Sequence, residues 1–166
     1  MSLLAVSIFD TFIKVLPPLV IVGGWVVVYQ LQALQARRKL LREEVEKTIE
    51  AVNELLDTAI RFHTTAYDES LKSSITLALT DIERRYSNFP RICTAKKSYL
   101  PNAAKLEKVQ IDPEYLINLR RSITIEHFDE KFEVELKHSD KKITIIRGAA
   151  LDLMNAVDKV FIEALD

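Results

Sequence analysis

The hydrophobic positions of this chain follow two different patterns, and the change falls near residue 31. From Val15 to Tyr29 the residues are almost all apolar, interrupted only by two prolines and two glycines. After Leu31 the apolar residues recur every three or four positions. That spacing is typical of helices that bury one face. We therefore expect an all-α fold, in which a single apolar N-terminal helix continues into an antiparallel helical bundle.

The apolar run is long enough to predict a membrane span. A helix that crosses a bilayer needs about 20 residues, and Thr11 to Leu31 supplies them if Lys14 extends its ammonium to the headgroups. Trp25 and Tyr29 are placed to lie near one interface. We expect a transmembrane helix over residues 11–31, preceded by an apolar segment over residues 1–10.

Three other interpretations of the run fit the residues less well. A buried core helix usually carries an apolar stripe, not apolar residues on all faces. A cleavable signal needs a basic start and small residues at its cleavage site, but residues 1–10 hold no Lys or Arg and Leu34 occupies one of the small positions. A buried parallel strand would belong to a βαβ pattern, which does not follow here.

Basic residues predict the orientation of the span. Four of them follow the run closely, whereas only Lys14 precedes it. Because positive charge is retained on the cytoplasmic side, we expect a single-pass protein of the cell (inner) membrane, with the N-terminus outside and residues 32–166 in the cytoplasm. Membrane lipid is then a partner, and the expected anchor residues are Trp25, Tyr29, Arg37, Arg38 and Lys39.

The remaining residues predict four amphipathic helices that bury their stripes together as a bundle. Residues 32–65 predict a stalk helix, because no Gly or Pro interrupts them. A second helix is expected from a cap at Asp68 to the sequence SNFP, residues 87–90. A third begins at Asp112 and Pro113, a capping residue followed by the proline that suits a first helical turn.

The fourth helix has the most regular pattern. It follows Ser139 or Asp140, either of which can cap it. Its apolar residues repeat with a spacing of three and four, as in a left-handed bundle: Ile143, Ile146, Ala150, Leu153, Val157, Val160 and Ala164. Residues 132–136, FEVEL, alternate like a strand but also fit a helix, to which we assign them.

Residues 88–110 predict a basic loop between the second and third helices. They carry five cations against one acidic residue. Such a loop either is solvated or contacts anionic lipid or an acidic ligand. Contact with lipid would be favourable, because each cation near an anionic membrane surface contributes about 1 kcal/mol. The residues expected to make that contact are Arg91, Lys96, Lys97, Lys105 and Lys108.

The composition excludes several classes of function. A net charge of −1 and a pI near 6.3 do not favour nucleic-acid binding. The single cysteine, Cys93, rules out an intramolecular disulfide and a thiolate metal cluster. Three glycines leave no phosphate-binding loop. We expect no cofactor and no metal, although the sequence EHFDE, residues 126–130, gathers carboxylates around a histidine.

One sequence feature suggests chemistry. Arg120 and Arg121 precede His127 by seven and six positions in the sequence RRSITIEH. This resembles the Arg-x4-6-His motif of the HEPN family, small all-helical proteins of which many are metal-independent ribonucleases acting as dimers. The resemblance implies that an arginine steadies phosphate charge and that His127 transfers a proton. The alternative is that both arginines pair with acidic surface residues.

The expected function is non-enzymatic. We expect a membrane-anchored interaction, scaffold or sensor protein that acts through its bundle and self-associates through the stalk, Leu31 to Phe62. A protein partner at the bundle fits the same interpretation. One alternative is a membrane-tethered HEPN-like ribonuclease. Another is a membrane-disrupting toxin or defence effector, because Pro17-Pro18 and Gly23-Gly24 make the span kinkable.

Overall fold

The computed structural model describes residues 3–94, 111–125, 128 and 136–163, and within these ranges it is helical and contains no strand. This confirms the all-α class for the described part of the chain. The chain divides into two compact units, Met1–Lys39 and Leu40–Asp166.

The helix α1, Leu3–Thr64, begins in the first unit and extends into the second. It has no Gly or Pro after Gly24. On its exposed face, Arg42 and Glu46 form an ion pair between successive turns. The Nε of Arg42 donates to Oε1 of Glu46 at 2.8 Å, and this carboxylate raises the pKa of Arg42. Strong helix formers and such pairs explain why the helix is not interrupted there.

The helix α2, Glu69–Thr94, begins as predicted but ends later. Oδ1 of Asp68 accepts the N–H of Ser70 at 2.8 Å, and the hydrogen bonds from Ser70 lower the pKa of Asp68. The predicted stop at SNFP is wrong, because the helix continues through Pro90. Phe89 is 1% exposed, so its burial holds the last turn even though a proline removes one backbone hydrogen bond. Residues 88–94 of the expected loop are therefore helical.

The helices α4, Pro113–Thr124, and α5, Lys141–Glu163, start at the predicted caps. Oδ1 of Asp112 accepts the N–H of Glu114, and Oδ1 of Asp140 accepts the N–H of Lys142, both at 2.9 Å. Between them, residues 132–135 of the sequence FEVEL lie outside the described residues. Leu136 is not helical, and its N–H donates to the carbonyl of His63 at 2.9 Å.

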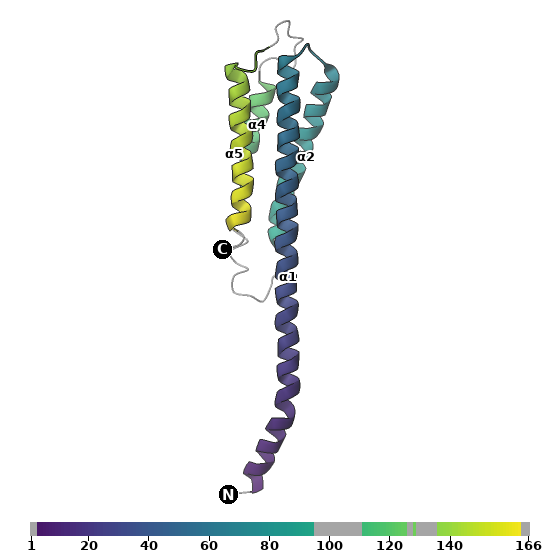
Figure 1. Cartoon of the computed structure of the whole chain (residues 1–166), viewed down its shortest axis with the longest axis vertical. Helices are drawn as coiled ribbons and strands as arrows, with labels where there is room; N and C mark the ends of the chain where they lie inside the picture. Colours follow the sequence, from purple (N-terminus) through teal and green to yellow (C-terminus); the bar gives the residue numbers. More distant parts are fainter. Residues whose placement is uncertain (1–2, 95–110, 126–127, 129–135, 164–166) are drawn as a thin grey trace. The chain divides into compact units, whose positions relative to one another are not determined.

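In the second unit, α1 from Leu40 onward packs with α2, α4 and α5. Figure 1 shows these helices side by side, with successive helices running in opposite directions. All four contribute to one apolar core, which forms because none of the stripes is large enough to be covered alone. The predicted stripe of α5 is confirmed, since its members from Ile143 to Val160 are buried.

The apolar stripe of the stalk is buried in the chain's own bundle. Six of its side chains between Leu41 and Phe62 are at most 5% exposed: Leu41, Val45, Val52, Leu55, Ala59 and Phe62. Ile49 is partly buried. Leu55 is buried in this stripe, whereas its neighbour Leu56 is only half-buried. Most of the apolar stripe in this stretch is therefore covered by the chain's own bundle. Self-association through the stalk stays a prediction.

Aromatic rings gather at the end of the bundle where α1 stops. The ring of Phe62 lies 5.2 Å from that of His63, 5.9 Å from that of Tyr67 and 5.5 Å from that of Phe128, between centroids. His63 is 1% exposed, and its Nε2 donates to the carbonyl of Ile123 at 3.1 Å. This joint ties the end of α1 to the end of α4.

Polar contacts also cross between helices of the bundle. Arg85 of α2 donates to Asp81 at 2.7 Å and to Glu44 of α1 at 3.4 Å. The hydrogen bonds that Asp81 accepts from Arg85 and Arg84 lower its pKa. The hydroxyl of Tyr86 donates to the carbonyl of Ile111 at 2.5 Å. Burial, assisted by the nearby charge of Asp112, raises the pKa of Tyr86 to about 12.

Candidate functional site

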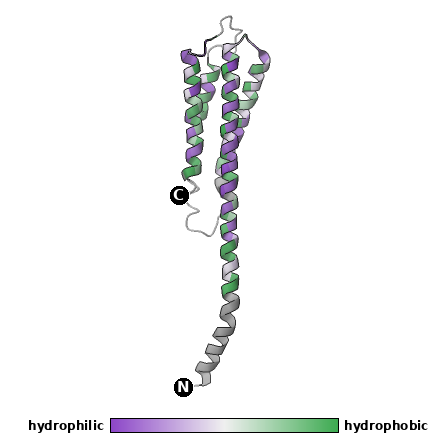
Figure 2. Ribbon diagram, viewed as in Figure 1, coloured by the Kyte–Doolittle hydropathy of each residue, from purple (hydrophilic) through white to green (hydrophobic). Residues whose placement is uncertain are grey.

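An exposed apolar run in the first unit is the most unusual surface of the described chain. Every large apolar side chain from Val20 to Tyr29 is between 49% and 73% exposed. Consecutive helical residues are rotated by about 100°, so ten of them point in every direction around the axis. Figure 2 shows this run as the mainly green part of α1 beside its grey N-terminal portion. Ordinary monomers rarely leave so large an apolar surface uncovered.

Among the described residues, no helix has a stretch that is both long and apolar enough to cross a bilayer. Side chains are described from Val20 onward, so those of residues 11–19, the first part of the predicted span, lie outside them.

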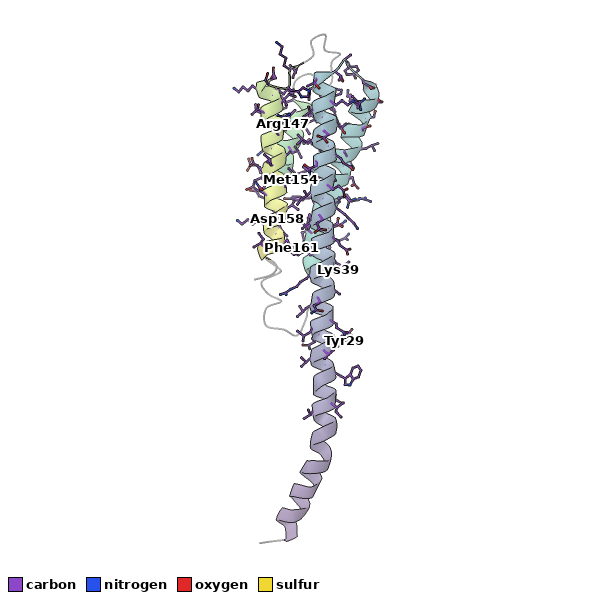
Figure 3. All side chains as sticks on the ribbon, in the orientation of Figure 1. Tyr29, Lys39, Arg147, Met154, Asp158 and Phe161 are labelled. Atoms are coloured by element: carbon purple, nitrogen blue, oxygen red, sulfur yellow. The ribbon has the colours of Figure 1, made fainter. Side chains whose placement is uncertain are left out.

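The predicted anchor residues lie in this first unit. Trp25 is 73% and Tyr29 72% exposed, and their separation by four positions places both on one side of the helix. Arg38 and Lys39 are exposed as well, whereas the side chain of Arg37 lies outside the described residues. Figure 3 labels Tyr29 and Lys39.

The motif residues on α4 are directed to different neighbours. The guanidinium of Arg120 lies 3.8 Å from the carboxylate of Glu83 on α2, and both side chains are more than half exposed. Arg121 instead lines a groove between α4 and α5. His127 lies outside the described residues. Of the motif, the structure therefore describes only the two arginines.

The groove between α4 and α5 is open and has a volume of about 800 Å³. Exposed apolar side chains line it beside charged ones. Cations lie toward the start of α5, and an acidic residue lies about three turns farther along it. The lining residues are Tyr115, Asn118, Arg121, Ser122, Ile125, Asp140, Lys141, Lys142, Ile145, Gly148, Ala149 and Asp152.

Lys142 has a structural role at this groove. Its ammonium donates to the carbonyl of Ile125, the C-terminal cap of α4, and its backbone N–H binds the cap of α5. The side chain therefore fixes the end of one helix against the start of the other. A mixed-charge groove of this kind suits a protein surface better than a small apolar ligand.

Of the basic residues expected to contact lipid, only Arg91 has a described side chain, and it is exposed on the last turns of α2. The others, Lys96, Lys97, Lys105 and Lys108, lie outside the described residues. Within the described ranges, no group of three or more His, Cys, Asp or Glu residues is placed to hold a metal ion. Most of the sequence EHFDE falls outside those ranges.

Sequence reasoning did not identify the α4–α5 groove. Its signal was weak: Ile125 and Ile145 are large apolar residues that fall outside the stripes, and Gly148 is the only glycine after the apolar run. Only the packing of α4 on α5 brings these residues together.

Comparisons with known proteins add no function to this description. No family model matches the chain, and neither a curated protein nor a solved structure is significantly similar to it.

Proposed function

We propose that this chain is a single-pass, membrane-anchored interaction or scaffold protein without enzymatic activity, which presents a helical bundle to the cytoplasm. The observation that supports the proposal most strongly is the exposure of apolar side chains on all sides of α1 from Val20 to Tyr29. The span proposed from the sequence covers residues 11–31.

Lipid is the environment that suits such a run. A protein partner that docks on one side of a helix covers about half its circumference and leaves the opposite residues in water. Hydrocarbon surrounds a helix completely, and its backbone groups are already satisfied internally. The cost of leaving eight large apolar side chains in water, at about 25 cal/mol per Å², therefore favours insertion.

The charges after the run support the proposed orientation. Arg38, Lys39 and Arg42 follow the apolar residues and are exposed. Cations in this position favour the cytoplasmic side of a membrane and its anionic headgroups. The role of the bundle as an interaction module is supported by its surface, which carries a groove lined by exposed apolar and charged side chains.

The anchoring is tested by placing charge in the run. We expect Val22→Arg combined with Val26→Arg to move the full-length protein from the membrane to the soluble fraction, because each Arg at the centre of a span costs about 2.5–3.5 kcal/mol. Flotation of membranes on a density gradient, with and without alkaline carbonate, measures the distribution. The matched control is Leu77→Arg with Ile117→Arg, which adds the same charge at exposed positions of the bundle.

Two results would contradict the anchoring. In one, wild-type protein stays in the supernatant after high-speed centrifugation without detergent. In the other, the two arginine pairs redistribute the protein to the same extent, which would indicate a general effect of charge and not a lipid-embedded run.

The two alternative functions remain predictions that the same material can test. If the chain is a ribonuclease, it should cleave RNA, and His127→Ala should abolish that cleavage. Against this alternative, Arg120 lies near Glu83 and Arg121 lines the groove, so the two arginines have different neighbours. A membrane-disrupting effector predicts loss of membrane potential on overexpression, which would depend on the apolar run.

A further inference from the structure

We propose that α5 carries a self-association site, at which two copies of this chain pair with their α5 helices antiparallel around a two-fold axis. Four residues define this site, which we call the pairing face: Lys141, Ile145, Gly148 and Asp152. All four are exposed, and all line the groove between α4 and α5.

The members of the pairing face lie on one side of α5. They are spaced by four, three and four positions, so at about 100° per residue they fall within about 60° of one another. The two charges at the ends, Lys141 and Asp152, are separated by about 16 Å along the helix axis, at about 1.5 Å per residue. They are too far apart to pair within one copy, and no ion pair involving either is present in the described part of the chain.

The spacing is the same when read from either end. The midpoint between Lys141 and Asp152 and the midpoint between Ile145 and Gly148 coincide, between residues 146 and 147. A two-fold axis through that point, perpendicular to α5, therefore places Lys141 opposite Asp152 of the second copy. The same axis places Ile145 opposite Gly148 of the second copy. Each contact then occurs twice, as two-fold symmetry requires.

Gly148 gives the pairing face a notch. A glycine inside a helix destabilises it relative to alanine, and a Cβ at Gly148 would meet nothing within 4 Å. Within the described chain, no close approach of another segment uses the missing side chain. Ile145 is 51% exposed beside it. In the proposed pair, Ile145 of each copy fills the notch over Gly148 of the other.

A neighbouring face of α5 repeats the spacing and serves as a rival. It consists of Arg147, Leu151, Met154 and Asp158, three of which are labelled in Figure 3. Met154 is partly buried against the core and occupies the position that corresponds to the notch. This face therefore has matching charges without a space for the opposing side chain, and its charges provide matched controls.

In this proposal, the partner of the interaction protein proposed above is a second copy of the same chain, so the inference rests on the proposed function. It involves residues of the second unit alone. Anchoring is measured by flotation and pairing by mass in detergent, so the failure of one is distinguishable from the failure of the other.

The test uses charge reversal in full-length protein solubilised in mild detergent. We expect light scattering across a concentration series to give twice the chain mass for the wild type, after correction for detergent. Lys141→Glu alone and Asp152→Lys alone place like charges opposite each other twice, and each is expected to raise the dissociation constant at least about tenfold.

An equimolar mixture of these two variants restores pairing, because the introduced charges meet across the axis and the unchanged residues meet on its other side. Gly148→Leu fills the notch and is expected to weaken pairing at least about tenfold, with an unchanged circular dichroism spectrum. Arg147→Glu and Asp158→Lys leave pairing unchanged. The proposal is overturned if the wild type is monomeric at every concentration, if mixing fails to restore the pair, or if the variants of the rival face have the same effect.

Discussion

Residues 20–29 and residues 41–62 belong to the same helix, yet their apolar side chains meet different surroundings. In the later stretch, the side chains between Leu41 and Phe62 follow a stripe and are buried against α2, α4 and α5. In the earlier stretch, the side chains from Val20 to Tyr29 are exposed on every side. Both stretches are apolar, so the amount of apolar surface does not decide what covers it. The distribution of that surface around the axis does.

The largest effect on stability is expected from removing a buried side chain of residues 41–62. Phe62→Ala should lower the free energy of unfolding by about 3–5 kcal/mol, because the ring is fully buried among three other rings. Trp25→Ala, which removes an even larger side chain at the exposed stretch, should change it by less than about 0.5 kcal/mol. Urea unfolding of both variants in mild detergent, followed by circular dichroism, provides the comparison. Equal losses would show that the two stretches share one core.

A smaller effect on stability is expected from removing the hydroxyl of Tyr86, which joins α2 to the residue before the cap of α4. Tyr86→Phe removes the hydrogen bond to the carbonyl of Ile111 and should cost about 0.5–1.5 kcal/mol at neutral pH. Tyr29→Phe is the matched control, since Tyr29 lies on the exposed stretch and its replacement should leave the unfolding of the bundle unchanged.

The same phenol makes part of the stability depend on pH. The pKa of Tyr86 is raised to about 12 in the folded chain, against about 10 for an unfolded tyrosine, so the folded state favours the neutral phenol. Its contribution is complete below about pH 10 and is lost as the pH rises toward 12. The difference in unfolding midpoint between wild type and Tyr86→Phe should therefore shrink over that interval. A constant difference would contradict this assignment.

The smallest effect on stability is expected at Thr48, a polar residue that is buried within residues 41–62. The hydroxyl of Thr48 donates to the carbonyl of Glu44 at 2.7 Å. Thr48→Val loses that bond, worth about 1 kcal/mol, and buries a methyl group, worth about 0.8 kcal/mol, so stability should change by less than about 0.5 kcal/mol. Thr48→Ala loses the bond without the methyl group and should be clearly less stable. Thermal melts of the two variants decide whether the stripe behaves as purely apolar.

Local features of this fold were predictable because they depend on neighbouring residues only. The caps Asp68, Asp112 and Asp140 act on amides two positions away, and the sequence alone identifies such contacts. The α5 stripe was predictable for the same reason, since periodicity is a local property. Pro90 was misjudged because the burial of Phe89, a tertiary effect, outweighs the local cost of the proline.

Features that depend on packing were not predictable. The stalk stripe was recognised, but its periodicity does not reveal whether α2, α4 and α5 or a second copy covers it. Arg120 and Arg121 are adjacent in the sequence, yet about 100° of helical rotation separates them, which directs one to α2 and the other to the groove. The groove itself exists only where α4 meets α5.

The joint at His63 has a consequence for how the chain is made. Its hydrogen bond to Ile123 connects residues 60 positions apart, and contacts over such separations form slowly compared with local helices. Ribosomes add about 5–20 residues per second. The stripe of α1 is thus synthesised roughly 5–20 seconds before the end of α5, which helps to cover it. During that interval the nascent chain carries a finished but uncovered helix, the kind of segment that chaperones bind.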